Sequence, residues 1–374
     1  MTLRWGGNGE MKKILIIIGK LCVGGAERVA RDIGYYADPE KYEIHYLVFE
    51  DDIGDYEPEL EQKGCKIIHM PSPGENHLAY YRDLSRLIRR EKYDVIHSHT
   101  MFSSGWAMMA GKVCSVPVRI CHSHSIRGNE KRGTLKNLYE NTMRRIILSF
   151  ATHYVACGKT AGQWLYGQKA FDEQGILILN GIGLQKFAYD PEKRSQIRLE
   201  LGLEEHFIIG HVGHLAQVKN QSYLLTLMDR ILQRRPDARL LLLGEGPDRS
   251  MLENMVARLE LKDKVIMPGN VSNVHEYLSA MDVFAFPSFY EGTPLATIEA
   301  QTNGLPCVIS DRIPPDVHLT DLITTLPLED AEDAWIEALC TVHRNDPLAY
   351  LSSMKKTDFE CSVMLNKIYG LYEG

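Results

Sequence analysis

Short apolar runs recur along the chain and alternate with segments whose apolar residues have helical spacing. The first run, Lys13–Ile18, is followed by a loop and then by a helical pattern from Ala26 to Ala37. Such runs are typical of strands buried on both faces of a parallel sheet. Further strands of this half are expected at Glu43–Phe49, Cys65–Met70, Asp94–His99, Val118–His124, His153–Cys157 and Ile176–Leu179. The alternation predicts right-handed βαβ units, whose ligands bind beyond the carboxyl ends of the strands.

A polar, charged stretch, Gln185–Leu203, interrupts this pattern, which then resumes. The strands expected after it are Phe207–Val212, Leu240–Gly246, Val265–Met267, Val283–Ser288 and Pro306–Ser310. A chain of 374 residues is also long enough for about two domains. We therefore predict an α/β protein with two Rossmann-like domains, residues 11–188 and 189–355, followed by a helical segment, 356–374.

The start of the chain and its cysteines indicate a cytoplasmic protein. The first ten residues, MTLRWGGNGE, lack the apolar core of a secretion signal, and we expect residues 1–10 to be a disordered extension before Met11. No apolar run approaches the roughly 20 residues of a membrane span. The eight cysteines form no CxxC pair, so we expect reduced thiols.

The most informative stretch is Val283–Asp311, a predicted strand, turn, helix and second strand. Thr293 is a suitable N-cap for the helix, and Pro294 suits its first position because that N–H would be free anyway. The amides that follow, together with the positive end of the helix dipole, form a site for phosphate. Glu291 lies before this helix start and Glu299 lies within the helix, with seven residues between them.

Two carboxylates beside an anion site are unfavourable if both must bind phosphate, because like charges repel. They are favourable if a hydroxyl-rich group lies beside the phosphate, since each carboxylate accepts two hydroxyl hydrogen bonds. A nucleotide sugar has that arrangement, with hydroxyls on both sides of a diphosphate. The simpler interpretation is a capped helix with one solvated acid.

The sequence EGTPLATIEAQTNGLPCVISD resembles the Glu-x7-Glu signature of glycosyltransferase family four, and the resemblance extends over nearly the whole chain from Met11. The family comprises retaining enzymes of the GT-B fold, and the likeness is closest to bacterial exopolysaccharide and capsule enzymes. It implies two Rossmann-like domains whose parallel sheets face across a cleft, with the last helix returning to the first domain. It also implies that Glu291 contacts the donor sugar, that Glu299 holds the ribose and that Gly292–Leu295 contact the donor.

A glycine pair, Gly24 and Gly25, lies between the first strand and its helix, where backbone can approach a phosphate closely. A GxGxxG fingerprint is absent, and Gly19-x4-Gly24 continues with Gly25–Ala26 where a P-loop requires Lys and Ser or Thr. The pair resembles the GGAE turn of the family, which faces the donor diphosphate and the acceptor.

The loop after Phe207–Val212 contains Gly213, His214 and Lys219. The family usually has Arg at the position of His214, and that Arg and the following Lys hold the diphosphate, a role that Lys219 fits. A neutral imidazole lacks the fixed charge of a guanidinium. Either the diphosphate keeps His214 protonated, or other donors replace it.

Two histidine pairs, His97 with His99 and His122 with His124, end two of the predicted strands. Alternate residues of a strand share a face, so each pair can project two imidazoles together. Zinc is an alternative on residue types alone, but no carboxylate or Cys accompanies them at ligand spacing and the family needs no metal. The simplest interpretation is that most of them cap strand ends and bond backbone. The family resemblance implies that His122 or His124 lies near the transferred sugar carbon.

Charge is unevenly distributed: up to Lys186 there are 25 Lys+Arg against 21 Asp+Glu, and the remainder has 17 against 28. The basic excess is greatest between Lys112 and Lys169, which suggests an anionic partner. We expect an anionic membrane surface, contacted by Lys131, Arg132, Lys136, Arg144 and Arg145. The alternative is an amphipathic helix whose solvated face is basic. Nucleic acid is a poorer partner because the other half is acidic.

These features together predict a retaining hexosyltransferase that uses a nucleotide sugar, expected to be a UDP-sugar, and a lipid-linked saccharide acceptor in exopolysaccharide or capsule synthesis. His122, His124 and Glu291 are the catalytic candidates, neither Glu has a covalent role, and no metal or other cofactor is expected. A non-catalytic sugar-nucleotide-binding subunit and a sugar-nucleotide 2-epimerase are the alternatives. A nucleotide-dependent oxidoreductase would need the dinucleotide fingerprint.

Overall fold

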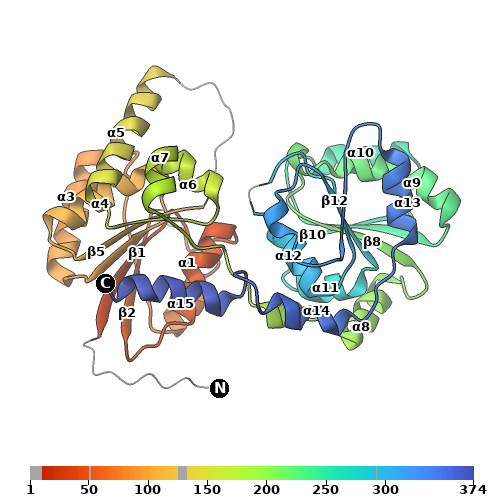
Figure 1. Cartoon of the computed structure of the whole chain (residues 1–374), viewed down its shortest axis with the longest axis horizontal. Helices are drawn as coiled ribbons and strands as arrows, with labels where there is room; N and C mark the ends of the chain where they lie inside the picture. The colour runs from red at the N-terminus through yellow and green to blue at the C-terminus, as the bar shows by residue number, and fades with distance from the viewer. Residues whose placement is uncertain (1–10, 50–51, 125–132, 292) are drawn as a thin grey trace. The chain divides into compact units, whose positions relative to one another are not determined.

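The computed structural model describes residues 11–49, 52–124, 133–291 and 293–374 (Figure 1). The predicted disordered extension, residues 1–10, lies outside the described residues. The chain forms two compact units, one up to Gly181 with the returning segment Ser362–Gly374, and one of Ile182–Cys361. The expected divisions were at 188/189 and 355/356, within about seven residues of these.

The first unit contains a seven-stranded parallel sheet in the order β3-β2-β1-β4-β5-β6-β7. Its strands are β1 (Lys12–Ile17), β2 (Tyr42–Val48), β3 (Lys66–His69), β4 (Val95–Ser98), β5 (Val118–Ser123), β6 (His153–Ala156) and β7 (Gly175–Leu177). Its helices are α1 (Gly25–Tyr35), α2 (Glu57–Gln62), α3 (His77–Glu91), α4 (Ser104–Val113), α5 (Thr134–Phe150), α6 (Lys159–Tyr166), α7 (Gln168–Gln174) and α15 (Cys361–Tyr372). All seven strands are present within two residues of the predicted bounds.

The second unit contains a six-stranded parallel sheet in the order β10-β9-β8-β11-β12-β13. Its strands are β8 (Phe207–Val212), β9 (Ala238–Leu243), β10 (Val265–Gly269), β11 (Val283–Phe286), β12 (Cys307–Ser310) and β13 (Ile323–Leu326). Its helices are α8 (Pro191–Leu201), α9 (Gln221–Arg234), α10 (Arg249–Arg258), α11 (Val274–Ala280), α12 (Leu295–Thr302), α13 (Glu332–Thr341) and α14 (Pro347–Met354). The edge strand β13 was missed because it is only partly buried and carries no apolar run.

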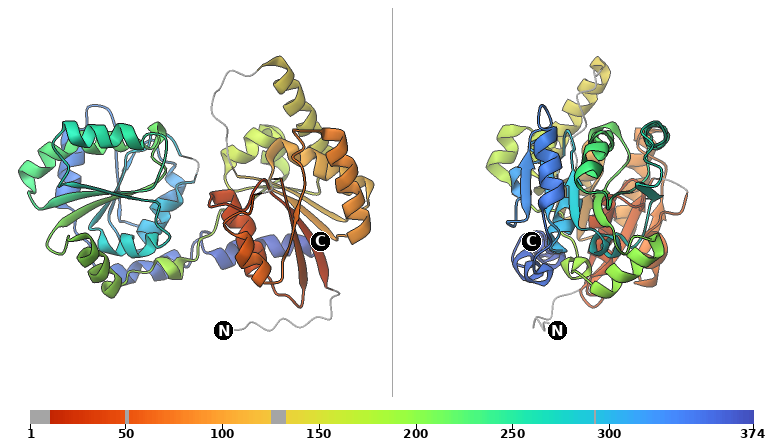
Figure 2. Two further views of the ribbon diagram at one scale, coloured as in Figure 1. Left: turned by 180° about the vertical axis from the view of Figure 1, so that it is seen from behind. Right: turned by 90° about the vertical axis from the view of Figure 1, so that its right-hand side faces the viewer.

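Helices cover both faces of each sheet, as expected for parallel strands (Figure 1 and Figure 2). In the first unit the four residues from Ile14 to Ile17 are wholly buried in β1. In the second unit the core is organised around Trp335, which is wholly buried and donates its indole N–H to the Pro327 carbonyl at 2.8 Å. Among the described residues no helix is long and apolar enough to cross a membrane.

The last helix, α15, packs on the first unit. The Tyr369 hydroxyl donates to the Ile33 carbonyl at 2.7 Å, and the Lys12 ammonium donates to the Tyr372 carbonyl at 2.8 Å. The Tyr372 side chain is wholly buried. These contacts tie the two ends of the described chain to the same sheet.

A partly buried carboxylate holds the start of β11 in place. Asp282 accepts hydrogen bonds from the Arg194 and Arg198 guanidinium groups at 2.6 and 2.5 Å and from the Ile208 amide at 2.7 Å. Arg198 is buried and also donates to the Ala280 carbonyl. Asp282 therefore links α8 to β8 and β11, the two strands that carry the loops described below.

We predict that Asp282→Ala lowers the free energy of unfolding of the second unit by about 3–5 kcal/mol, because it leaves the buried Arg198 without a counter-charge. Urea denaturation would measure this. The control is Asp333→Ala, which removes an exposed carboxylate paired with Arg230 and should cost at most about 1 kcal/mol. Equal losses in the two variants would contradict the assignment.

Candidate functional site

Two loops of the second unit meet at the carboxyl edge of its sheet, because β8 and β11 are neighbouring parallel strands. The loop after β8 ends in the 3-10 turn η3 (Gln217–Lys219) and in Asn220, which has a left-handed φ of 54°. Two hydrogen bonds join this turn to the loop after β11: the Phe289 amide donates to the Val218 carbonyl at 2.8 Å, and the Asn220 side chain donates to the Pro287 carbonyl at 3.2 Å.

This junction brings together Lys219 and Glu291, two of the predicted donor-binding residues. Their ammonium and carboxylate groups form an ion pair with an Nζ–Oε1 distance of 2.6 Å. The Lys219 side chain is 20% exposed and that of Glu291 is 10% exposed, so water screens the pair only partly. The ammonium also lies 5.2 Å from the centre of the Phe286 ring, within the range of a cation–π contact. A cation and an acid are therefore held at the edge where ligands bind.

The helix after Glu291 begins one residue later than predicted. Helix α12 starts at Leu295, and Pro294 is its N-cap with φ −76° and ψ 85°, so the prediction of Thr293 as N-cap and Pro294 as first helical residue is wrong. The ψ of Pro294 is not helical, and no side chain caps the helix. The amides of the first turn are nevertheless presented at this edge, and Glu299 is a buried residue of the same helix. Gly292 lies outside the described residues.

Gly213 and His214 lie beside this junction. The Gly213 amide donates to the Leu243 carbonyl at 3.0 Å, and a Cβ on Gly244, whose φ is +133°, would lie 2.1 Å from the Gly213 carbonyl oxygen. The loops after β8 and β9 are thus in close backbone contact, which only glycine permits at position 244. The His214 side chain is exposed, while its carbonyl accepts a hydrogen bond from Gln221 at 2.9 Å. The imidazole is therefore accessible to a ligand.

The sequence analysis missed the side chains that support this loop. His211 is wholly buried in β8 and its Nδ1 lies 2.9 Å from the Ala285 carbonyl of β11. Its Nε2 lies 3.2 Å from the Gln221 amide nitrogen, and Gln221 in turn holds the His214 carbonyl. Burial lowers the pKa of His211 to about 4. The available signal was a histidine within an otherwise apolar strand run.

In the first unit, the predicted glycine turn begins α1. Gly24 is the N-cap, in extended conformation with φ −171°, and a Cβ there would lie 2.2 Å from a carboxylate oxygen of Glu27. A Cβ on Gly25 would meet nothing within 4 Å, so the space beside this residue is open. The backbone at Gly25 is therefore open to close approach, and the predicted contact with a ligand stays a prediction.

The four predicted histidines form one cluster at the carboxyl ends of β4 and β5. The rings of His97 and His99 have centres 4.3 Å apart and those of His122 and His124 are 4.0 Å apart, so each pair projects two imidazoles together. His97 Nε2 lies 3.2 Å from His122 Nδ1, and His99 Nδ1 lies 2.7 Å from His124 Nε2. The interpretation that these side chains bond backbone is therefore wrong, since their nitrogens face one another.

The inner part of the cluster is anchored by the last helix. The Tyr372 hydroxyl lies 2.7 Å from His97 Nδ1. His122 is wholly buried, whereas His124 is partly exposed. Ring nitrogens of His97, His99 and His122 lie within 4.8 Å of one another, a spacing at which a metal would become possible if the hydrogen bond between His97 and His122 opened.

Burial keeps this cluster uncharged near neutral pH. It lowers the pKa of His97 to about 3 and that of His124 to about 4. It lowers the pKa of His99 and His122 well below the ordinary value, and the neighbouring imidazoles lower it further because adjacent cations would repel. The neutral imidazoles bond one another, but His99 Nε2, His122 Nε2 and His124 Nδ1 are buried without a hydrogen-bond partner among the described residues.

The lowered pKa values predict acid sensitivity. Each buried histidine has a pKa in the folded protein below its value of about 6.5 in the unfolded protein. The free energy of unfolding is therefore greatest above that pH. As the pH decreases toward the folded pKa, it falls by about 1.4 kcal/mol per pH unit and per histidine. Urea denaturation at pH 7 and pH 5 should show a smaller loss for His97→Gln than for the wild type. His343 is exposed, and His343→Gln should lose as much free energy of unfolding between the two pH values as the wild type does. Identical losses in all three proteins would contradict the prediction.

One residue of the predicted basic membrane surface, Arg144, bonds within the protein. The Arg144 guanidinium on α5 donates to the Leu165 and Trp164 carbonyls at 2.9 and 3.0 Å, so it ties α5 to α6 instead of facing solvent. Lys136 and Arg145 of the same helix are exposed. Leu135 and Leu138 are also 84% and 64% exposed. The predicted contacts Lys131 and Arg132 lie outside the described residues.

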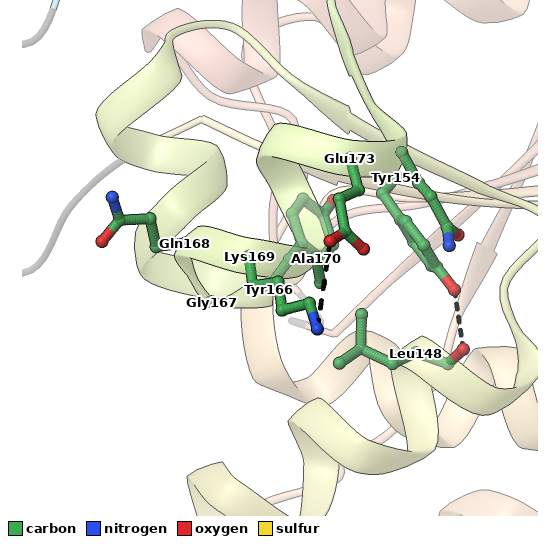
Figure 3. Close-up of a pocket in the computed structure, with 9 residues that line it drawn as sticks. Leu148, Tyr154, Tyr166, Gly167, Gln168, Lys169, Ala170 and Glu173 are labelled. Atoms are coloured by element: carbon green, nitrogen blue, oxygen red, sulfur yellow. Dashed lines mark hydrogen bonds and ion pairs between the residues drawn. The ribbon is translucent and has the colours of Figure 1, made fainter.

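A hollow of about 490 Å³ in the first unit lies apart from the predicted site residues (Figure 3). It is bordered by the end of α5, by β6 and by the junction of α6 and α7. In it, the Tyr154 hydroxyl donates to the Leu148 carbonyl at 2.6 Å, and Lys169 lies 4.0 Å from Glu173. None of the residues that line it is a predicted site residue.

Comparison with known proteins identifies the family. The family model described as "Glycosyltransferase Family 4" matches residues 23–186, and that described as "Glycosyl transferases group 1" matches residues 193–342. The chain is 32% identical over 337 residues to the "Putative glycosyltransferase EpsF" of Bacillus subtilis (strain 168), covering 89% of this chain and 88% of that protein.

Two further relatives extend the comparison. A UDP-Gal:alpha-D-GlcNAc-diphosphoundecaprenol alpha-1,3-galactosyltransferase of Escherichia coli is 29% identical over 61% of this chain and 60% of that protein. The crystal structure of Anabaena HepE in complex with UDP matches with a TM-score of 0.76 and 21% identity, over 97% of this chain and all of the other. The chain therefore belongs to the family 4 glycosyltransferases, and its two units have the GT-B fold.

Proposed function

We propose that this glycosyltransferase moves a hexosyl unit from a UDP-sugar to a lipid-linked saccharide, with retention of configuration, in exopolysaccharide or capsule synthesis. The observation that carries the proposal is the contact of Lys219 with Glu291 beside the start of α12. A relative named as acting on a diphosphoundecaprenol acceptor and a structural neighbour solved with UDP support the substrate classes.

Each group at the junction has a role in this proposal. Lys219 and the first amides of α12 stabilise the negative charge that develops on the departing diphosphate. Glu291 accepts hydrogen bonds from the sugar hydroxyls, and Glu299 from those of the ribose. Neither Glu forms a covalent bond to the sugar. The reaction needs no metal in this scheme, because Lys219 and the helix start supply the positive charge.

In the first unit we assign roles to the turn at Gly24 and Gly25 and to one histidine. Of the two histidine candidates we assign His124 to the donor sugar, because His122 is wholly buried and bonded to His97. His99 holds the ring of His124 at 2.7 Å and so fixes its orientation.

Donor turnover tests the proposal. Purified protein is incubated with UDP-, GDP- and ADP-sugars, and release of the nucleoside diphosphate is measured with and without membrane extract as acceptor. We expect release from one or two UDP-sugars, a loss of about 10²–10³-fold in Lys219→Ala because one charge-stabilising donor is removed, and a comparable loss in Glu291→Ala. The exposed Lys262→Ala is the control and should retain activity.

A second candidate function is a binding subunit that turns nothing over, favoured by the replacement of the usual Arg by His214. Binding of UDP-sugars without release in the presence of acceptor extract would support it. Absence of any sugar-nucleotide binding would overturn both functions.

We also propose that the protein is cytoplasmic and attaches peripherally to the inner face of the membrane through the first half of α5. Leu135 and Leu138 are exposed there beside the exposed Lys136. Leucines beside basic residues suit the boundary between headgroups and acyl chains, where a lipid-linked acceptor is found.

Vesicle flotation tests this attachment. The double variant Leu135→Ser, Leu138→Ser should bind vesicles containing anionic lipid at least about tenfold more weakly, because two exposed side chains no longer bury apolar surface. Leu199→Ser removes an equally exposed leucine from α8 of the second unit and should bind as the wild type does. Equal binding by all three proteins would show that α5 is not the contact.

A further inference from the structure

The ion pair between Lys219 and Glu291 has a consequence for substrate selection. The cation proposed to bind the diphosphate is bound by the carboxylate proposed to bind the sugar, at 2.6 Å. With side chains 20% and 10% exposed, the pair is better shielded from water than an ordinary surface pair. A diphosphate must compete with Glu291 for Lys219.

Hydrogen bonds of the surrounding backbone hold the loops of Lys219 and Glu291 together, so the two residues cannot easily move apart when a ligand binds. Phe289 and Asn220 bind the two loops together by their hydrogen bonds to the Val218 and Pro287 carbonyls. The Ser310 hydroxyl further holds the Ser288 carbonyl at 2.6 Å. The backbones of Lys219 and Glu291 are thus held close together, so a diphosphate bound to Lys219 would lie near the charge of Glu291.

The donor nucleotide sugar and the product nucleoside diphosphate interact differently with this ion pair. When a nucleotide sugar binds, the diphosphate takes Lys219 and the sugar hydroxyls give Glu291 new hydrogen bonds. When the free nucleoside diphosphate binds, Glu291 loses Lys219 and receives no hydroxyls in return. Its charge then lies uncompensated beside an anion that carries one more ionisable oxygen than the donor.

We propose that Glu291 competes with the diphosphate for Lys219 and thereby makes the site prefer a nucleoside diphosphate that carries a sugar over the free nucleoside diphosphate. The preference favours binding of donor and release of product. This inference rests on the proposed function, and it assigns Glu291 a role in product release in addition to its contact with the sugar.

Isothermal titration of the whole protein with UDP and with UDP-glucose, UDP-galactose and UDP-N-acetylglucosamine tests the proposal. In Glu291→Gln, which keeps the size of the side chain, the affinity for UDP should rise about tenfold, equivalent to about 1.4 kcal/mol. The affinity for the UDP-sugar that the wild type binds most tightly should rise less or fall. Glu253→Gln makes the same charge change on the exposed face of α10 and should leave both affinities unchanged.

A double-mutant cycle separates competition for Lys219 from simple repulsion between Glu291 and the nucleotide. If the two residues compete as proposed, Glu291→Gln raises UDP affinity much less in a Lys219→Ala background than in the wild type. An equal gain in both backgrounds would mean repulsion alone and would overturn the proposal, as would unchanged or weaker UDP binding in Glu291→Gln. Circular dichroism of every variant establishes that it is folded.

Failure of this inference differs from failure of the proposed function. If the wild type binds neither UDP nor any of the three UDP-sugars, the proposed function is wrong and the inference falls with it. If the wild type binds and turns over a UDP-sugar but Glu291→Gln leaves the ratio of the two affinities unchanged, only the inference is wrong.

Discussion

A parallel sheet whose two faces are covered by helices presents neither face to a ligand, so the residues that must meet a ligand lie at the strand ends. In the second unit this constraint brings the loops after β8 and β11 together, because the two strands are direct neighbours in the sheet. In the first unit it brings the ends of β4 and β5 together and gathers four histidines there. Both groups of candidate residues are consequences of strand order, with sequence separations of 72 residues for Lys219 and Glu291 and 25 for His99 and His124.

The same constraint explains the polar residues inside the sheets. A histidine in a strand buried on both faces has no water to bond, so it needs partners on the neighbouring strand. His211 bonds the carbonyl of Ala285, and His97 bonds His122 and Tyr372. In each case a buried nitrogen is satisfied by an element that also carries or supports a candidate functional loop. The hydrogen bonds that remove the desolvation cost are therefore the ones that position the site.

Every strand except β13 could be predicted from the sequence because apolar runs are local signals, and β13 carries no such run. Contacts between residues that are distant in the sequence could not be predicted, because they depend on how the elements pack. The contact of Arg144 with the Trp164 and Leu165 carbonyls depends on how α5 packs on α6, and nothing in the spacing of basic residues indicates it. The position of Thr293 outside α12 depends on the ψ of Pro294, which the residue type leaves free. The pairing of Lys219 with Glu291 required the strand order of the second sheet.

The charge of the second half of the chain sets a final condition on the site. After Lys186 there are 17 Lys+Arg against 28 Asp+Glu, yet this half contains the residues assigned to an anionic nucleotide. Because charges more than about 8 Å apart are largely screened at physiological ionic strength, binding has to come from groups in direct contact, which in the proposed function are Lys219 and the amides of α12. A site with one strong local cation, itself shared with a carboxylate, holds a diphosphate less firmly than a cluster of free cations would, which suits an enzyme that must release its nucleotide after every transfer.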